Sequence, residues 1–127
     1  MGSPVLVRFS DDIIALLRDG TSLTRRKEPG SSPRFDGFTV ASYVLTETPA
    51  HDGERHADGD ELLLVISGDC VAVLDAPDGG TEEVSIRAGD ALVIPRNIWH
   101  RLVIDKPCHI VFVTPGPRME HRGLRDT

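Results

Sequence analysis

The chain has 127 residues, a length that fits one folded domain with a core of its own. Its apolar fraction of 39% and charged fraction of 27% are those of an ordinary globular protein. The net charge is −6 and no large Lys/Arg patch is present, which argues against a nucleic-acid partner. No apolar stretch approaches the length of a membrane span or a secretion signal, so we expect a cytoplasmic protein that does not insert into a membrane.

The first part of the chain is predicted to hold one short helix and a connector. Ser10 and two acidic residues precede a run that is apolar at positions 13, 14, 16 and 17, a capping pattern followed by a helical stripe. We therefore expect a helix over residues 10–19, ending near Gly20. Residues 21–36 are polar and rich in Pro, Gly and Ser, which predicts a connector that wraps over the surface.

The rest of the chain is predicted to be a series of strands. The candidates are residues 38–46, 61–67, 70–75, 82–86, 91–94, 99–104 and 109–114, with Gly- and Asp-containing turns between several of them. Short strands at regular spacing are typical of a sandwich or closed barrel. We expect a single domain over 1–127, with a barrel core at about 36–115, the helix and connector at 10–36, and a polar tail at 116–127 that forms an arm or a frayed end.

One stretch brings metal-binding side chains together. An Asp-Gly pair within residues 57–60 favours a tight turn, which would place His56 opposite Glu61 in a hairpin. Glu54 lies two positions from His56 and so on the same strand face. The imidazole and the two carboxylates suit a borderline or hard divalent ion and need a partner from elsewhere. His100, which opens a later strand after a Pro-containing turn, is the candidate fourth ligand.

These residues resemble the two motifs of the cupin superfamily. The first motif, G-x5-H-x-H-x3,4-E-x6-G, compares with Glu54-x-His56-x4-Glu61-x6-Gly68, in which Glu54 replaces the first His. The second motif, G-x5-P-x-G-x2-H-x3-N, compares with the segment from Gly89 through Pro95 to His100. There Asn97 stands for the middle Gly and Ile104 for the final Asn. Asn tolerates the left-handed backbone better than most residues, so the first of these replacements is mild.

The resemblance implies a fold and a metal site. The implied fold is an all-β double-stranded β-helix, or jelly-roll barrel. The implied ligands inside it are Glu54, His56, Glu61 and His100, around a divalent Mn, Fe, Ni or Zn ion. A carboxylate in the first position adds negative charge and favours harder ions. The alternative is a barrel that holds no metal, with Glu54 and Glu61 turned to solvent and His100 a core residue.

Other polar residues receive simpler interpretations. His51 has the wrong parity for the same strand face and is interpreted as a turn residue, and His121 as an exposed tail residue. Cys70 and Cys108 fall in apolar runs and are expected to be buried thiols rather than a disulfide. We expect either a metal-dependent enzyme, of oxygenase or isomerase type, acting on a small polar molecule, or a non-catalytic module that binds a small ligand.

The apolar run at residues 62–66 predicts a second layer of protein or a partner. With Glu61, Leu63 and Val65 facing the lumen, Leu62, Leu64 and Ile66 would face outward. A strand that is apolar on both faces is covered on both faces. We therefore expect a homodimer that packs sheet against sheet, with an exchanged N-terminal strand from residues 4–9 as a further contact.

Overall fold

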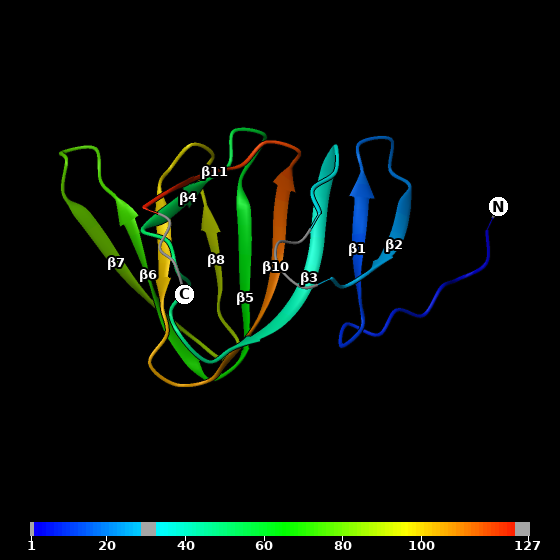
Figure 1. Cartoon of the computed structure of the whole chain (residues 1–127), viewed down its shortest axis with the longest axis horizontal. Helices are drawn as coiled ribbons and strands as arrows, with labels where there is room; N and C mark the ends of the chain where they lie inside the picture. The colour runs from blue at the N-terminus through cyan, green and yellow to red at the C-terminus, as the bar shows by residue number, and fades with distance from the viewer. Residues whose placement is uncertain (1, 29–32, 124–127) are drawn as a thin grey trace.

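The computed structural model describes residues 2–28 and 33–123, and in those residues it contains eleven strands and no helix (Figure 1). The strands are β1 (Asp12–Leu17), β2 (Ser22–Arg26), β3 (Gly37–Leu45), β4 (Gly53–Arg55), β5 (Glu61–Ser67), β6 (Asp69–Asp75), β7 (Thr81–Arg87), β8 (Ala91–Ile94), β9 (His100–Val103), β10 (Cys108–Gly116) and β11 (Glu120–Arg122). The predicted all-β class is confirmed, and all seven predicted strands are present with ends shifted by at most two residues. Nowhere in this part of the chain is there a helix long and apolar enough to cross a bilayer.

The strands form two antiparallel sheets. The larger sheet has the order β2-β1-β3-β10-β5-β8, and the smaller has the order β11-β4-β9-β6-β7. Side chains from both sheets meet in one buried cluster: Leu63, Val65, Cys70, Ala72, Ile86, Ile94, Leu102, Ile104, Cys108 and Ile110. Strands that follow one another in sequence often lie in different sheets, the arrangement of a jelly roll rather than a meander.

The predicted N-terminal helix is wrong. Residues 12–17 form β1, which pairs with β2 on one side and β3 on the other. Ile13 and Ala15 are buried at 1% and 0% exposure, while Leu16 is 45% exposed, so burial alternates with a period of two. The apolar run fits a helical stripe and a strand equally well, and two adjacent β-branched residues with an open sheet edge at β3 favour the strand.

Two segments interpreted as irregular also contain strands. The connector at 21–36 includes β2, which returns along β1 after a turn closed by the Leu17 amide to the Thr21 carbonyl at 2.8 Å. The tail at 116–127 includes β11, which pairs with β4 and lies beside it in Figure 1. Residues 29–32 of the connector and 124–127 of the tail lie outside the described part of the chain.

Two turns of the motif region depend on a left-handed backbone conformation that few residues adopt. Asn97 has a φ of +63°, which confirms that Asn serves where a Gly is typical. Gly68 has a φ of +80°, and a Cβ there would lie 2.6 Å from the Pro107 carbonyl oxygen. The Gly68 turn therefore joins β5 of one sheet to β6 of the other where the chain passes close to the loop before β10.

Candidate metal centre

The four predicted ligands come together from both sheets. Glu54 lies in β4 and is the cross-strand neighbour of His100 in β9. Glu61 opens β5 in the other sheet, and His56 lies in the segment that crosses between the sheets. The predicted hairpin between residues 54–56 and 61 is wrong, because β4 pairs with β9 and β11, whereas β5 pairs with β8 and β10. The side chains meet because the two sheets face each other, not because two neighbouring strands pair.

The donor atoms are spaced as the ligands of one ion would be. His100 Nε2 lies 2.9 Å from Glu61 Oε1 and 3.5 Å from Glu54 Oε1. His56 Nε2 lies 3.6 Å from the same Glu61 oxygen and 3.7 Å from the same Glu54 oxygen. Ligands bonded at about 2.1 Å stand roughly 3.0–3.5 Å apart around an octahedral or tetrahedral centre, so these separations need only small adjustments.

Neighbouring groups hold two of these side chains in ligating orientation. The Nδ1–H of His100 donates to the Ile98 carbonyl at 2.9 Å, which turns Nε2 toward the site. The Thr114 hydroxyl donates to Glu61 Oε2 at 2.7 Å, which leaves Oε1 facing the two imidazoles. Outer contacts of this kind fix the rotamer and tautomer of metal ligands in proteins.

His56 provides the test of whether a metal fits. Its side chain is 2% exposed, and neither ring nitrogen has a hydrogen-bond partner among the described residues. A buried imidazole whose nitrogens make no hydrogen bond is costly, because its polar atoms have exchanged water for no donor or acceptor of their own. Its Nε2 faces two carboxylate oxygens across a gap too long for a hydrogen bond and suited to a shared ion. The residues present therefore fit a divalent metal.

The charges of the site reinforce one another. Burial alone would raise the pKa of Glu54 and Glu61, but the facing imidazoles of His100 and His56 outweigh it and hold both pKa values below the usual range. Burial alone would lower the pKa of the imidazoles, but the two carboxylates raise the pKa of His56 to about 9 and that of His100 to about 10. The site thus holds two ionised carboxylates that favour positive charge.

A cavity of about 180 Å³ opens beside the donor cluster. Its wall combines apolar side chains with two arginines and three of the predicted ligands: Arg34, Thr39, Ala41, Tyr43, Leu45, Pro49, His51, Glu54, Glu61, Leu63, His100, Arg101, Leu102, Phe112 and Thr114. Pockets for drug-sized ligands measure roughly 300–1,000 Å³, so this one fits a molecule of only a few non-hydrogen atoms.

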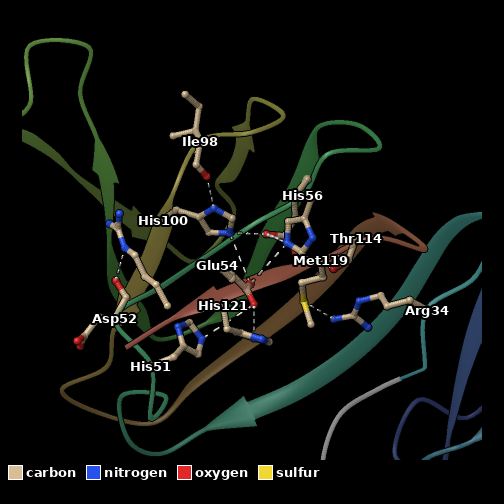
Figure 2. A network of polar contacts seen from close by, with 12 residues as sticks. Arg34, His51, Asp52, Glu54, His56, Ile98, His100, Thr114, Met119 and His121 are labelled. Carbon is tan, nitrogen blue, oxygen red and sulfur yellow. Dashed lines mark hydrogen bonds and ion pairs between the residues drawn. The ribbon is translucent and has the colours of Figure 1, made fainter. Parts of the chain in front are cut away.

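Two histidines that the sequence analysis set aside also reach the site. His121 Nε2 lies 3.4 Å from Glu54 Oε2, and His51 Nε2 lies 4.0 Å from the same oxygen. Figure 2 shows the Glu54 carboxylate between His56 and His100 on one side and His51 and His121 on the other. His121 is exposed, as expected, but it does not lie in a frayed end, because β11 holds it opposite Glu54. Strand parity gave no sign of either contact, since His51 lies in the bend before β4 and His121 lies on a strand added from the end of the chain.

Comparison with known proteins places this barrel in a family. The family model of the cupin domain matches residues 44–114, which include all four candidate ligands. The match covers more than half of the chain, so the protein belongs to the cupin domain family. This confirms the resemblance carried by the two motifs. No curated protein matches the sequence.

Solved structures confirm the fold. A cupin-2 domain containing protein from Shewanella frigidimarina is similar with a TM-score of 0.54 at 20% identity, over 71% of this chain and 85% of that one. Peruvianin-I, a cysteine peptidase from Thevetia peruviana latex, has a TM-score of 0.57 at 17% identity, over 70% of this chain and 58% of its own. For the S161A mutant of Bacillus subtilis oxalate decarboxylase the TM-score is 0.53 at 19% identity, over 66% of this chain and 23% of that one. The chain therefore spans just over half of Peruvianin-I and about a quarter of the decarboxylase, and at these identities the likeness shows the fold alone.

Proposed function

We propose that the protein is a metal-dependent cupin that holds one divalent ion with Glu54, His56, Glu61 and His100. The observation that carries the proposal is His56, whose ring nitrogens are buried without hydrogen-bond partners in the described chain while Nε2 faces two carboxylates. Two imidazoles and two carboxylates suit Mn, Fe, Ni or Zn, and the second carboxylate favours the harder of these ions. When bound, the ion would act as a Lewis acid on a ligand in the adjoining cavity.

The cavity is suited to a small molecule that carries a carboxylate. Arg34 and Arg101 line the cavity together with three of the candidate ligands. They place positive charge there in a protein whose net charge is −6. Guanidinium groups bind carboxylates with paired, charge-assisted hydrogen bonds. Apolar neighbours such as Tyr43 and Phe112 would exclude water around the bound molecule. A small hydroxy acid or keto acid has both the size and the charge that these residues require.

The site favours an enzyme whose chemistry is centred on the ion. An isomerase needs a base with a pKa near the working pH, whereas the pKa values of Glu54 and Glu61 are held low, so both carboxylates serve better as ligands than as proton acceptors. An oxygenase-type enzyme makes no such demand on them. The second candidate is a non-catalytic module that binds the same small acid. The only observation that favours it is the small cavity, which can hold a ligand without converting it.

Metal analysis tests the proposal. Protein purified without chelator is expected to carry about one divalent ion per chain, and His100→Ala is expected to remove most of it. His109→Ala is the matched control, because His109 lies on β10 with its ring against Ser42 and outside the cluster. Full occupancy in His100→Ala would contradict the ligand assignment. Incubating loaded protein with small hydroxy and keto acids then separates the candidates: turnover supports the enzyme, and binding without conversion supports the module.

We also propose that two chains associate through the outer face of the larger sheet. Val44, Ile66 and Val93 are 61%, 52% and 54% exposed there, on β3, β5 and the edge strand β8. The predicted outward direction of Leu62, Leu64 and Ile66 agrees with the burial pattern of β5, in which the alternate residues are buried. A contiguous apolar sheet face of this kind marks an interaction surface, and a two-fold axis lets one self-complementary face cover itself.

The thiols of Cys70 and Cys108 are both free, which fits the cytoplasm that we propose as the location.

A further inference from the structure

The Glu54 carboxylate has a second set of imidazoles on its other side. Its Oε1 faces His100 and His56 at 3.5 and 3.7 Å, while its Oε2 faces His121 and His51 at 3.4 and 4.0 Å. One donor atom from each of His51, Glu54 and His121 lies within 4.8 Å of the others. A single carboxylate thus separates two clusters of donors, each with its own pair of histidines (Figure 2).

The chain holds the outer cluster in place with an arrangement of its own. His121 is positioned by β11, whose register on β4 sets it directly opposite Glu54. His51 precedes β4 in a bend that is fixed by the amide of Asp52, which donates to the Arg122 carbonyl at 2.9 Å. The two imidazole rings lie with their centroids 5.0 Å apart.

Ion pairs along β11 fasten this strand to the barrel on both sides of His121. Arg55 donates to the two oxygens of Glu120 at 3.2 and 3.1 Å. Arg122 donates to the two oxygens of Asp75 at 2.9 and 2.7 Å. Paired contacts of this geometry fix orientation as well as position. His121 therefore reaches Glu54 from a strand that is held at both neighbouring residues.

We propose that His51, Glu54 and His121 form a second divalent-cation site, with the Glu54 carboxylate shared between it and the inner four-residue site. Two imidazoles and one carboxylate, with a position left open, are a donor set typical of Zn²⁺. Zn–N and Zn–O bonds of about 2.0–2.1 Å place tetrahedral ligands roughly 3.4 Å apart, which matches the His121–Glu54 separation and requires a small approach of His51. Carboxylate-bridged ions in two-metal sites stand about 3.5–4 Å apart.

The two sites differ in chemistry and in access. The inner site has two carboxylates and is nearly closed, since His56, Glu61 and His100 are 2–3% exposed. The outer site has one carboxylate, and its side chains are 15–28% exposed. We therefore expect the outer site to bind more weakly, to prefer Zn²⁺, and to exchange its ion with solvent during purification. Two divalent ions against two carboxylates leave a charge of +2, which an anionic molecule in the adjoining cavity would offset.

Zinc titration of the metal-free, full-length protein tests the proposal. Wild type is expected to bind two Zn²⁺ per chain by calorimetry and elemental analysis, the second at least tenfold more weakly than the first. His121→Gln and His51→Gln are each expected to bind one. The control is His109→Gln, which keeps both ions. Because His51 is not on β11, its variant remains informative if His121→Gln loosens the strand. Co²⁺ supplies a second readout, since a four-coordinate outer ion absorbs strongly in the visible range and that absorbance is lost in both variants.

The variants separate failure of this site from failure of the inner one. If wild type binds one Zn²⁺, which is lost in His100→Ala but retained in His51→Gln and His121→Gln, the outer site is refuted and the inner site stands. If the single ion is lost in His121→Gln and retained in His100→Ala, the outer site stands and the inner assignment falls. Two ions in wild type and also in both outer variants would overturn the proposal.

Discussion

His100 Nε2 lies 2.9 Å from Glu61 Oε1, although the two residues belong to different sheets and are 39 positions apart in the chain. The contact joins β9 to β5 across the interior, and both side chains are nearly inaccessible to water. In the metal-free protein it is a charge-assisted hydrogen bond. The same nitrogen and oxygen are the atoms that would bind an ion, so a proton and a metal compete for one place.

The first prediction is that metal affinity rises steeply with pH. The carboxylates raise the pKa of His56 to about 9 and that of His100 to about 10, so both imidazoles are protonated on both nitrogens and positively charged in metal-free protein at neutral pH. Binding one divalent ion must then release two protons, and the association constant is expected to rise on the order of 100-fold per pH unit below about pH 9. Calorimetry in buffers of different ionisation enthalpy counts the protons released. A count near zero at pH 7 would contradict the protonated site.

The stability of the metal-free protein is expected to follow the same groups. The raised pKa values of His56 and His100 stabilise the fold fully below their unfolded value of about 6.5, and this contribution is lost as the pH rises through about 9 and 10. The lowered pKa values of Glu54 and Glu61 stabilise it above about 4.5, and that contribution is lost on acidification. Thermal melts with chelator should therefore show greatest stability at mildly acidic pH, with a fall at alkaline pH that added metal reverses.

The third prediction concerns the strand that carries His121. Arg122 forms its two-point ion pair with Asp75 while its guanidinium lies 4.7 Å from the centre of the Trp99 ring. Because these side chains are more than a third exposed, Arg122→Ala is expected to lower the free energy of unfolding by less than about 1 kcal/mol. Locally the effect is larger: amide hydrogen exchange in β11 should speed up at least tenfold, because the three-residue strand would keep only one of its two side-chain ion pairs.

Metal binding then reports whether β11 matters for the site. Arg122→Ala should weaken the outer Zn²⁺ site and leave the inner one unchanged, since His121 belongs only to the former. Arg87→Ala, at an exposed position of β7, is the matched control and should alter neither exchange in β11 nor metal content. Unchanged exchange in Arg122→Ala would show that the ion pair does not hold the strand.

The sequence predicted the barrel well because its strands and turns are locally encoded. Alternation of buried and exposed residues, as at Leu63 and Val65, is a property of neighbouring positions, and so is the left-handed turn at Asn97. The segment around Ile13 was misread because five apolar residues in a row fit both periods, and only pairing with β3 decides between them. Local pattern is ambiguous wherever the partner lies far away in the chain.

In the candidate site, too, the features encoded by neighbouring residues were predicted and those that depend on distant pairing were not. The four residues predicted from the motifs do come together, but through a crossing between sheets and not through the expected hairpin. His121 was missed because its contact with Glu54 requires β11 to add to β4, a pairing between segments some 65 residues apart. His51 was missed because it reaches Glu54 from the bend before β4, where strand parity does not apply. Nothing in the polar sequence of the tail marks it as a strand. Long-range pairing of weak strands is what a single sequence reveals least.

The last prediction is that disrupting the outer face of the larger sheet yields monomers. Wild type is expected to have twice the chain mass of 13.8 kDa by light scattering at micromolar concentration. Leu64, which lies between Val111 and Ala91 on the outer face, and Val44, which is 61% exposed, are the positions to change. Burying an aliphatic side chain of this size contributes roughly 1.5–3 kcal/mol, and placing a carboxylate there costs more because the charge would lose its water.

Leu64→Asp and Val44→Asp are therefore each expected to weaken association by at least 100-fold, with the strand content of the circular dichroism spectrum unchanged. Val44→Asp is the variant less prone to unfold the chain, because the Val44 side chain is already largely in solvent within one chain. Loss of the dimer in this variant therefore reports on association and not on folding. Ser85→Asp, at an exposed position of β7 in the smaller sheet, is the matched control and should remain dimeric. A wild-type mass of one chain throughout the micromolar range would refute the dimer. Variants that stay folded and dimeric would place the contact elsewhere, because two buried carboxylates facing each other across a two-fold axis cannot be accommodated without a large loss of affinity.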